Sequence, residues 1–173
     1  MPIAAAAAYR ESRAAEPLPA TPEIIDTNVH LFEWPFRQLK YGRTEALIAK
    51  LRKHRITTAW AGSFEAVLEK QLDLVNRRLV EECKARGDGM LIPIGSINPA
   101  WPDWEADLKQ CHEQHHMPGI RLYPMYHGYA LDHPEFGRLV AEAAKRKMLV
   151  QIVLRLEDER VHHEKRNDAD WQV

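Results

Sequence analysis

The sequence has few cysteines, no excess of either charge and no long apolar run, and each absence excludes a class of protein. Its two cysteines, Cys83 and Cys111, cannot form a disulfide framework and fit a reducing, cytoplasmic compartment. The 24 basic and 25 acidic residues leave a net charge of −1, which gives no electrostatic footprint for nucleic acid. No apolar run approaches the length of a membrane span, so we expect no membrane partner.

What is present is an ordinary globular composition, with 45% hydrophobic and 28% charged residues among 173, which is enough to bury a core. The N-terminal segment differs from the rest. Its apolar residues 3–8 precede Arg10 and Arg13, which is the reverse of the order in a signal peptide. Because three prolines in residues 14–22 then interrupt any helix, we expect a flexible arm at residues 1–22.

From residue 23 onward, β-branched apolar runs alternate with amphipathic helical stripes. Strands are predicted at 24–26, 56–61, 90–97, 119–123 and 149–154, and helices at 43–54, 64–86, 103–117 and 132–147. Asp103 is predicted to cap the third helix, and Gly87 to end the second. Strands that alternate with helices in this way predict a parallel α/β sheet.

The spacing of the strands predicts a particular architecture. The strands begin about 31 residues apart, and eight such units would need about 250 residues, the usual size of a (β/α)8 barrel. The sequence supplies about five units, at residues 23–158, followed by a polar tail without apolar periodicity at residues 159–173. We therefore expect a partial TIM-like (β/α) barrel with about five parallel strands, in a chain truncated before the last units.

Polar side chains follow the ends of the predicted strands, where parallel α/β proteins carry their active sites. Asp26, Asn28 and His30 come first, and residues two apart on a strand point the same way. A His-X-His pair at such a place grips a divalent metal, which makes hydroxide from water, although Asn28 is a weaker zinc ligand than imidazole. In the alternative, Asp26 and Asn28 cap a turn while His30 packs beside Trp34.

Five stretches of the sequence carry a family resemblance. They are residues 24–30, 56–59, 94–99, 119–124 and 149–152. Together, from about residue 23 to 158, they resemble the amidohydrolase-related proteins, the "amidohydrolase 2" branch of metal-dependent hydrolases. The resemblance implies a distorted (β/α)8 barrel, zinc or another divalent metal, and hydrolysis or decarboxylation of small ring or carboxylate substrates.

The resemblance also implies roles for individual residues. The family's first-strand His-X-His falls on Asn28 and His30, its fifth-strand histidine falls near Val153, and its eighth-strand aspartate has no counterpart. Of the four metal positions only His30 is kept, so His30, with Asn28 beside it, would hold the metal or polarise water, zinc being the first choice. Asp26 would orient the site.

The predicted substrate-binding residues are Asn28, Arg121, Tyr123 and His127. Arg121 and Tyr123 match the end of the family's fourth strand, where a basic or aromatic residue contacts an anionic substrate. The alternative for both is packing inside the barrel. The predicted partner is a small-molecule substrate.

A rival motif lies at the end of the third predicted helix. His112, Glu113 and His116 fit the H-E-x-x-H pattern of zinc metalloproteases, in which two histidines on one helix face bind zinc. Polar neighbours, the adjacent Pro118 and a position at the opposite end of the strands from the expected site argue against this interpretation. Histidines are in any case favourable near a helix C-terminus.

Three hypotheses about function follow. The first is an enzyme of the metal-dependent hydrolase lineage, incomplete as this chain. The second is a non-catalytic partial barrel that serves as an interaction or oligomerisation module, because its exposed sheet edges can pair with another chain. The third is the zinc metalloprotease.

Overall fold

The computed structural model describes residues 23–34 and 37–154. The elements are β1 (Ile24–Leu31), α1 (Thr44–Lys53), β2 (Ile56–Ser63), η1 (Glu65–Val67), α2 (Leu72–Arg86), β3 (Leu91–Pro93), β4 (Gly95–Ser96), α3 (Trp104–Lys109), η2 (Gln110–Gln114), β5 (Gly119–Leu122), α4 (Pro124–His127), α5 (Pro134–Lys145) and β6 (Leu149–Ile152). The predicted arm at 1–22 and tail at 159–173 lie outside the described residues.

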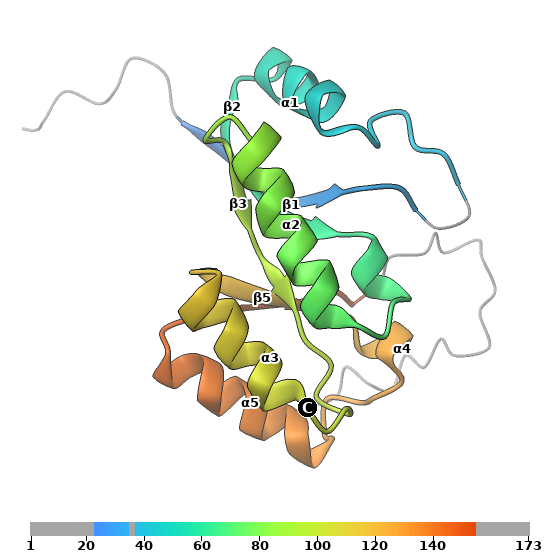
Figure 1. Cartoon of the computed structure of the whole chain (residues 1–173), viewed down its shortest axis with the longest axis vertical. Helices are drawn as coiled ribbons and strands as arrows, with labels where there is room; N and C mark the ends of the chain where they lie inside the picture. The colour runs from blue at the N-terminus through green and yellow to red at the C-terminus, as the bar shows by residue number, and fades with distance from the viewer. Residues whose placement is uncertain (1–22, 35–36, 155–173) are drawn as a thin grey trace, which may run out of the picture.

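All strand pairs are parallel, and the strands follow one another in chain order, β1-β2-β3 and then β4-β5-β6. Ile94 separates β3 from β4, and its N–H donates to the Ala61 carbonyl at 2.8 Å. Residues 91–96 therefore act as one strand that pairs with β2 through its first half and with β5 through its second (Figure 1). This is the predicted partial barrel, with five parallel strands alternating with helices.

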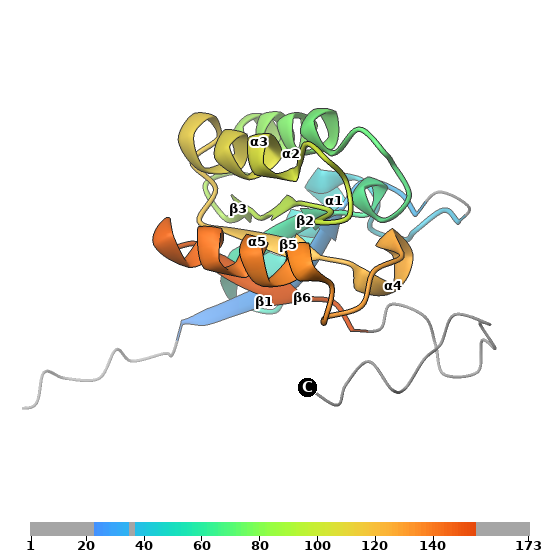
Figure 2. The ribbon, with the colours of Figure 1, turned by 90° about the horizontal axis from the view of Figure 1, so that it is seen from below.

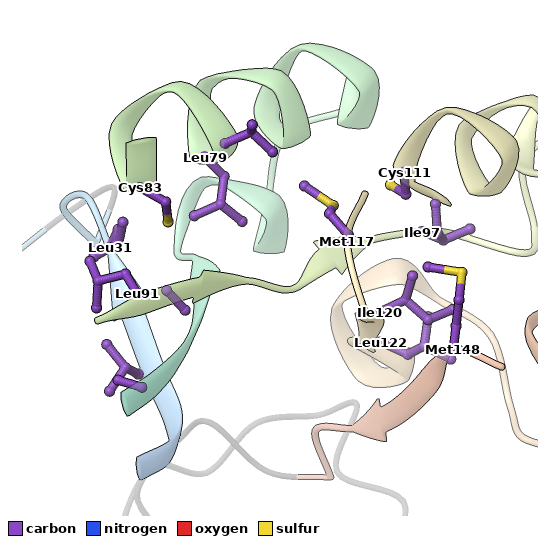
Figure 3. Close-up of a cluster of buried hydrophobic side chains, with 14 of the residues drawn as sticks. Leu31, Leu79, Cys83, Leu91, Ile97, Cys111, Met117, Ile120, Leu122 and Met148 are labelled. Carbon is purple, nitrogen blue, oxygen red and sulfur yellow. The ribbon is translucent and has the colours of Figure 1, made fainter. Parts of the chain in front are cut away.

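The helices lie on the outer side of the strands, and α2 and α3 run side by side there (Figure 2). A core cluster fills the space between the two layers, and Figure 3 shows Leu79 and Cys83 of α2 directed toward the strands. Ile120 and Leu122 of β5 are fully buried in the same cluster. Each such side chain stabilises the fold by about 1.5–3 kcal/mol.

Two helix predictions need correction. The predicted helix at 64–86 is a short 3-10 turn, η1, followed by α2, because the turn brings Ala66 and Val67 into a second apolar cluster and leaves Leu68 46% exposed. The third helix ends at Lys109 and continues as a π-helical turn, and the Asp103 side chain makes no capping hydrogen bond. At the start of this helix the Asp107 N–H instead donates to the backbone carbonyl of Asp103, at 3.1 Å.

Strand β1 extends past its predicted end and contains a bulge. Asp26 pairs with Ala59 and Val29 pairs with Ala61. Between these two pairs, β1 moves three positions along its chain while β2 moves two, so β1 contains one extra residue. The Asp26 carboxylate accepts the Asn28 N–H at 2.9 Å and closes the bulge as a local turn. An inserted residue reverses the side on which the following side chains stand.

Candidate active site

The bulge decides how the first-strand residues are arranged. Because it lies between Asp26 and His30, the predicted common face of Asp26, Asn28 and His30 is not formed. Asn28 is exposed, and Asp26 closes the turn, as the alternative for these two residues proposed. The His30 ring stacks on Phe64 at 4.6 Å between centroids, and Trp34 meets the edge of Phe64 rather than His30.

His30 lies between a phenol and a guanidinium. Its Nε2 atom is 3.1 Å from the Tyr123 hydroxyl and 3.2 Å from Nη1 of Arg121. A guanidinium only donates, so Nε2 accepts, and the ring is the tautomer with its proton on Nδ1. Burial, and then the Arg121 charge, lower the pKa of His30 from 6.5 to about 3, so the imidazole is neutral at physiological pH.

Arg121 crosses the inside of the sheet from β5 to β1, and its side chain is completely buried. Its five N–H donors meet five acceptors, which are the Gln151 Oε1 at 2.8 Å, the Val29 carbonyl at 2.8 Å, the Thr27 carbonyl at 3.0 Å, the Trp60 carbonyl at 3.2 Å and His30 Nε2. Two of the three carbonyls belong to the β1 bulge. The guanidinium thus replaces the ladder hydrogen bonds that the bulge disrupts.

The space for the guanidinium depends on Gly62, which faces His30 across the β1–β2 pair. A Cβ at Gly62 would lie 2.5 Å from Nη1 of Arg121. The N–H groups of Arg121 contact neighbouring groups of the chain, as the packing alternative predicts, and the contact with an anionic substrate stays a prediction. We call Arg121 and its hydrogen-bond partners the Arg121 brace. Gln151 is part of this brace, and its own amide also donates to the Thr27 carbonyl at 3.1 Å.

Tyr123 lies between His30, which it contacts through its hydroxyl, and the second apolar cluster, to which its ring belongs. It is buried, and burial raises its pKa to about 12, which the Arg121 charge offsets only in part. Its ring belongs to the second apolar cluster, with Trp34, Trp101 and Tyr126 packed against it. The Tyr123 ring lies 6.2 Å from the His30 ring and 5.7 Å from the His127 ring, near α4 (Pro124–His127), which follows β5 (Figure 1).

His127 is the last residue of α4, the short helix that follows β5. Its Nε2 donates to the Ala66 carbonyl at 2.8 Å, so Nδ1 carries the free lone pair. That Nδ1 is buried and makes no hydrogen bond of ordinary geometry among the described residues, while the ring also interacts with the Ile97 backbone. Burial lowers the pKa of His127, and the ring stacks on Trp101 at 6.0 Å and meets Tyr123 at 5.7 Å.

The described residues do not fit a resident divalent metal. They contain no group of three His, Cys, Asp or Glu side chains placed to hold one. His30 turns its only free lone pair to Arg121, and Asn28 is exposed within the bulge. Val153, at the position that would carry another ligand, packs against the apolar cluster. The metal predicted at His30 and Asn28 is therefore not supported by this geometry.

The H-E-x-x-H interpretation is not supported either. His112 and Glu113 lie in the π-helical turn, and His116 follows its end with a left-handed φ of 53°, so the two histidines do not share a helix face. They line a surface hollow together with Arg146 and Lys147, whose charges repel a metal cation.

Sequence reasoning missed three residues of the site. Phe64 supplies the stacking surface for His30, Gly62 supplies the space and Gln151 holds the guanidinium. Only Gln151 leaves a signal in the sequence, since it is a lone polar residue inside the apolar run 149–154.

No helix among the described residues is long and apolar enough to cross a membrane.

The family model described as Amidohydrolase matches residues 25–165. Comparison with curated protein sequences finds no significant match. Among solved structures, the apo IDCase of Metarhizium anisopliae matches with a TM-score of 0.61 at 14% identity, over 76% of this chain and 50% of that chain.

Two decarboxylases also match. The 2,6-dihydroxybenzoate decarboxylase from Rhizobium has a TM-score of 0.58 at 15% identity, over 81% of this chain and 52% of that one. The 5-carboxyvanillate decarboxylase from Novosphingobium aromaticivorans, solved with manganese and 3-methoxy-4-hydroxy-5-nitrobenzoic acid, has a TM-score of 0.58 at 16% identity, over 75% and 50%. The chain thus spans about half the length of these proteins, and at such identities the likeness shows the fold.

Proposed function

Because the chain belongs to the amidohydrolase family, we propose that it forms one wall of a small-molecule site for hydrolysis or decarboxylation of ring-bearing carboxylates. The site lies at the carboxyl ends of the five strands, which is where parallel α/β proteins bind their ligands. The substrate class proposed is a hydroxybenzoate, the class that the names of two structural neighbours give for those proteins.

The observation that carries the proposal is the buried Nδ1 of His127, which makes no hydrogen bond of ordinary geometry within residues 23–34 and 37–154. A buried acceptor without a donor costs about 1–3 kcal/mol, which a ligand hydroxyl at that place would recover. The surrounding rings of Trp101 and Tyr123 offer faces and edges to an aromatic ligand. A phenolic acid supplies both the hydroxyl and the ring.

Each chain residue has a proposed role in binding. His127 accepts the hydroxyl of the substrate, Tyr123 presents its own hydroxyl at the floor of the site, and the charge of Arg121 attracts the carboxylate without donating to it. His30 holds a neutral imidazole against the Tyr123 hydroxyl. Zinc is not given a role, because the described residues do not fit it.

The proposal is tested by titrating 2,6-dihydroxybenzoate and benzoate against the tryptophan fluorescence of the chain, with product formation followed by chromatography. We expect the hydroxylated acid to bind about tenfold more tightly, from the one added hydrogen bond. His127→Phe removes that preference, while His54→Phe, at an exposed position on α1's C-terminal end, keeps it. Equal affinity for the two acids, or a preference that survives in His127→Phe, refutes the proposal.

A second function, self-association, is favoured by where apolar side chains are exposed. Ile24 and Ile25 of β1 are 40% and 50% exposed, and Leu149 of β6 is 39% exposed. Both strands are sheet edges, and exposed apolar edges pair with other chains. Light scattering decides it, since a monomer at all concentrations contradicts self-association and a dimer lost in Ile25→Lys supports it.

The cytoplasmic location is also a proposal. It is supported by two buried thiols, Cys83 and Cys111, neither of which forms a disulfide. Recovery of the chain from the cytoplasmic fraction of its own cells would support the proposal, and recovery outside the cytoplasm would contradict it.

A further inference from the structure

The ligand atom that the family resemblance assigns to a metal faces a cation of the chain itself. We propose that the Arg121 guanidinium permanently takes the place of a divalent metal at His30, so that the site carries a built-in positive charge and binds no metal there. The inference is independent of the substrate and holds whether or not hydroxybenzoates bind.

The position of the guanidinium leaves no room for a metal at His30. A zinc–imidazole bond places the metal about 2.0–2.1 Å from nitrogen, along its lone pair. The only lone pair of the neutral His30 ring lies at Nε2, and Nη1 of Arg121 is 3.2 Å from that atom. A metal bound there would overlap the guanidinium, so metal and Arg121 exclude one another.

The guanidinium cannot readily leave this position. It is held by five acceptors on β1, β2 and β6, and Gly62 leaves it just enough space. Moving it away would strip the Thr27 and Val29 carbonyls of the bulge of their donors, at about 1–3 kcal/mol for each buried group. A metal held by one imidazole and the exposed Asn28 would not gain enough binding free energy to offset that cost.

The guanidinium also places a positive charge beside the Tyr123 hydroxyl. Its five hydrogen-bond acceptors are neutral groups, and the Asp26 carboxylate acts on its charge without a hydrogen bond to it. In a buried site a fixed charge acts over several ångströms with little screening. The guanidinium thus supplies the stabilisation of developing negative charge near the Tyr123 hydroxyl that a metal otherwise provides.

The experiment measures metal in the full 173-residue chain, produced in medium supplemented with zinc and manganese, by elemental mass spectrometry. We expect far less than one equivalent, with the same value in His30→Ala and in the exposed-site control His54→Ala. Excess EDTA is expected to leave the melting temperature unchanged. About one metal per chain, lost in His30→Ala but retained in His54→Ala, overturns the proposal.

A second measurement uses the imidazole ¹⁵N resonances of His30 during titration with excess Zn²⁺. In the wild type we expect no shift of Nε2. Arg121→Gln removes the cation but keeps amide donors. In this variant we expect the Nε2 resonance of His30 to shift with Zn²⁺, because the Nε2 lone pair of His30 becomes accessible. A shift in the wild type, or a folded Arg121→Gln that responds as the wild type does, overturns the proposal. Should Arg121→Gln not fold, the wild-type and His30→Ala results still decide.

Discussion

Two buried polar side chains, Arg121 and Asn76, each serve an irregularity of the same sheet. Arg121 donates to the carbonyls of the β1 bulge. Asn76, on α2, pairs with both backbone groups of Ser96, donating to its carbonyl at 2.9 Å and accepting its N–H at 2.8 Å, where residues 91–96 pass from one partner strand to the other. In each case a side chain restores the hydrogen bonds that a regular ladder would have made.

The difference between them lies in charge and position. Asn76 is neutral and lies on the helix side, where its amide also donates to Cys111 Sγ at 3.3 Å. Arg121 is charged and lies inside the sheet, in contact with His30 at the carboxyl ends of the strands. Both side chains hold the backbone, but only the charged Arg121 also sets the chemistry of a candidate site.

Removing the charged brace should have the largest effect. Arg121→Met leaves the buried carbonyls of Thr27, Val29 and Trp60 without donors, so we expect the free energy of unfolding to fall by more than about 3 kcal/mol. Urea unfolding followed by circular dichroism measures it. The control is Arg138→Met, at a side chain 59% exposed, which should change stability far less than Arg121→Met does. Similar losses in both variants would contradict a bracing role for Arg121.

Removing the neutral brace should cost less. Asn76→Leu deprives one N–H and one carbonyl of Ser96 of their partners, and we expect a loss of about 2 kcal/mol in the same assay. The His30 resonances should stay unchanged in this variant, because Asn76 does not contact the site. A loss larger than that of Arg121→Met would reverse the ranking of the two networks.

Crowding the brace tests the space that it needs. The Cβ of Gly62→Ala would lie 2.5 Å from Nη1 of Arg121, so we expect a loss of about 1–3 kcal/mol together with a change in the His30 resonances. The matched control is Gly137→Ala in α5, where a Cβ meets nothing within 4 Å and helix propensity favours alanine. If Gly62→Ala matches the control, the guanidinium does not occupy the position described.

The two networks should also differ in their response to pH. The folded-state pKa of His30 is about 3 against a usual 6.5, so below pH 6.5 the unfolded chain binds a proton that the folded chain does not. The contribution of His30 to stability is therefore complete above pH 6.5 and declines as the pH falls toward 3, by up to about 1.4 kcal/mol per pH unit.

His30→Gln should make the free energy of unfolding less dependent on pH between about pH 4 and 7, the range in which an ordinary histidine titrates. Urea unfolding at several pH values in this range measures it. Asn76→Leu should leave the slope unchanged, because the thiol beside it has a pKa raised by burial to about 12 and does not titrate there. A His30→Gln profile as steep as that of the wild type would mean that the ring is protonated in the folded state.

The architecture could be predicted from the sequence, because alternating apolar runs and helical stripes report directly on buried faces. The site could be predicted only in part. The strand-end rule selected His30, Tyr123 and His127, but two-residue periodicity failed across the β1 bulge, which depends on how Asp26 closes a turn. The role of Arg121 depends on contacts with residues more than 60 positions away, such as Trp60, and no local pattern encodes these.

The contact between Arg121 and His30 carries most of the account, and the tautomer of His30 tests it most directly. We predict that the imidazole ¹⁵N spectrum at neutral pH shows a neutral ring with the proton on Nδ1 and an unprotonated Nε2 that accepts hydrogen bonds. A proton on Nε2, or a doubly protonated ring, would contradict the account, because neither form can accept from the guanidinium.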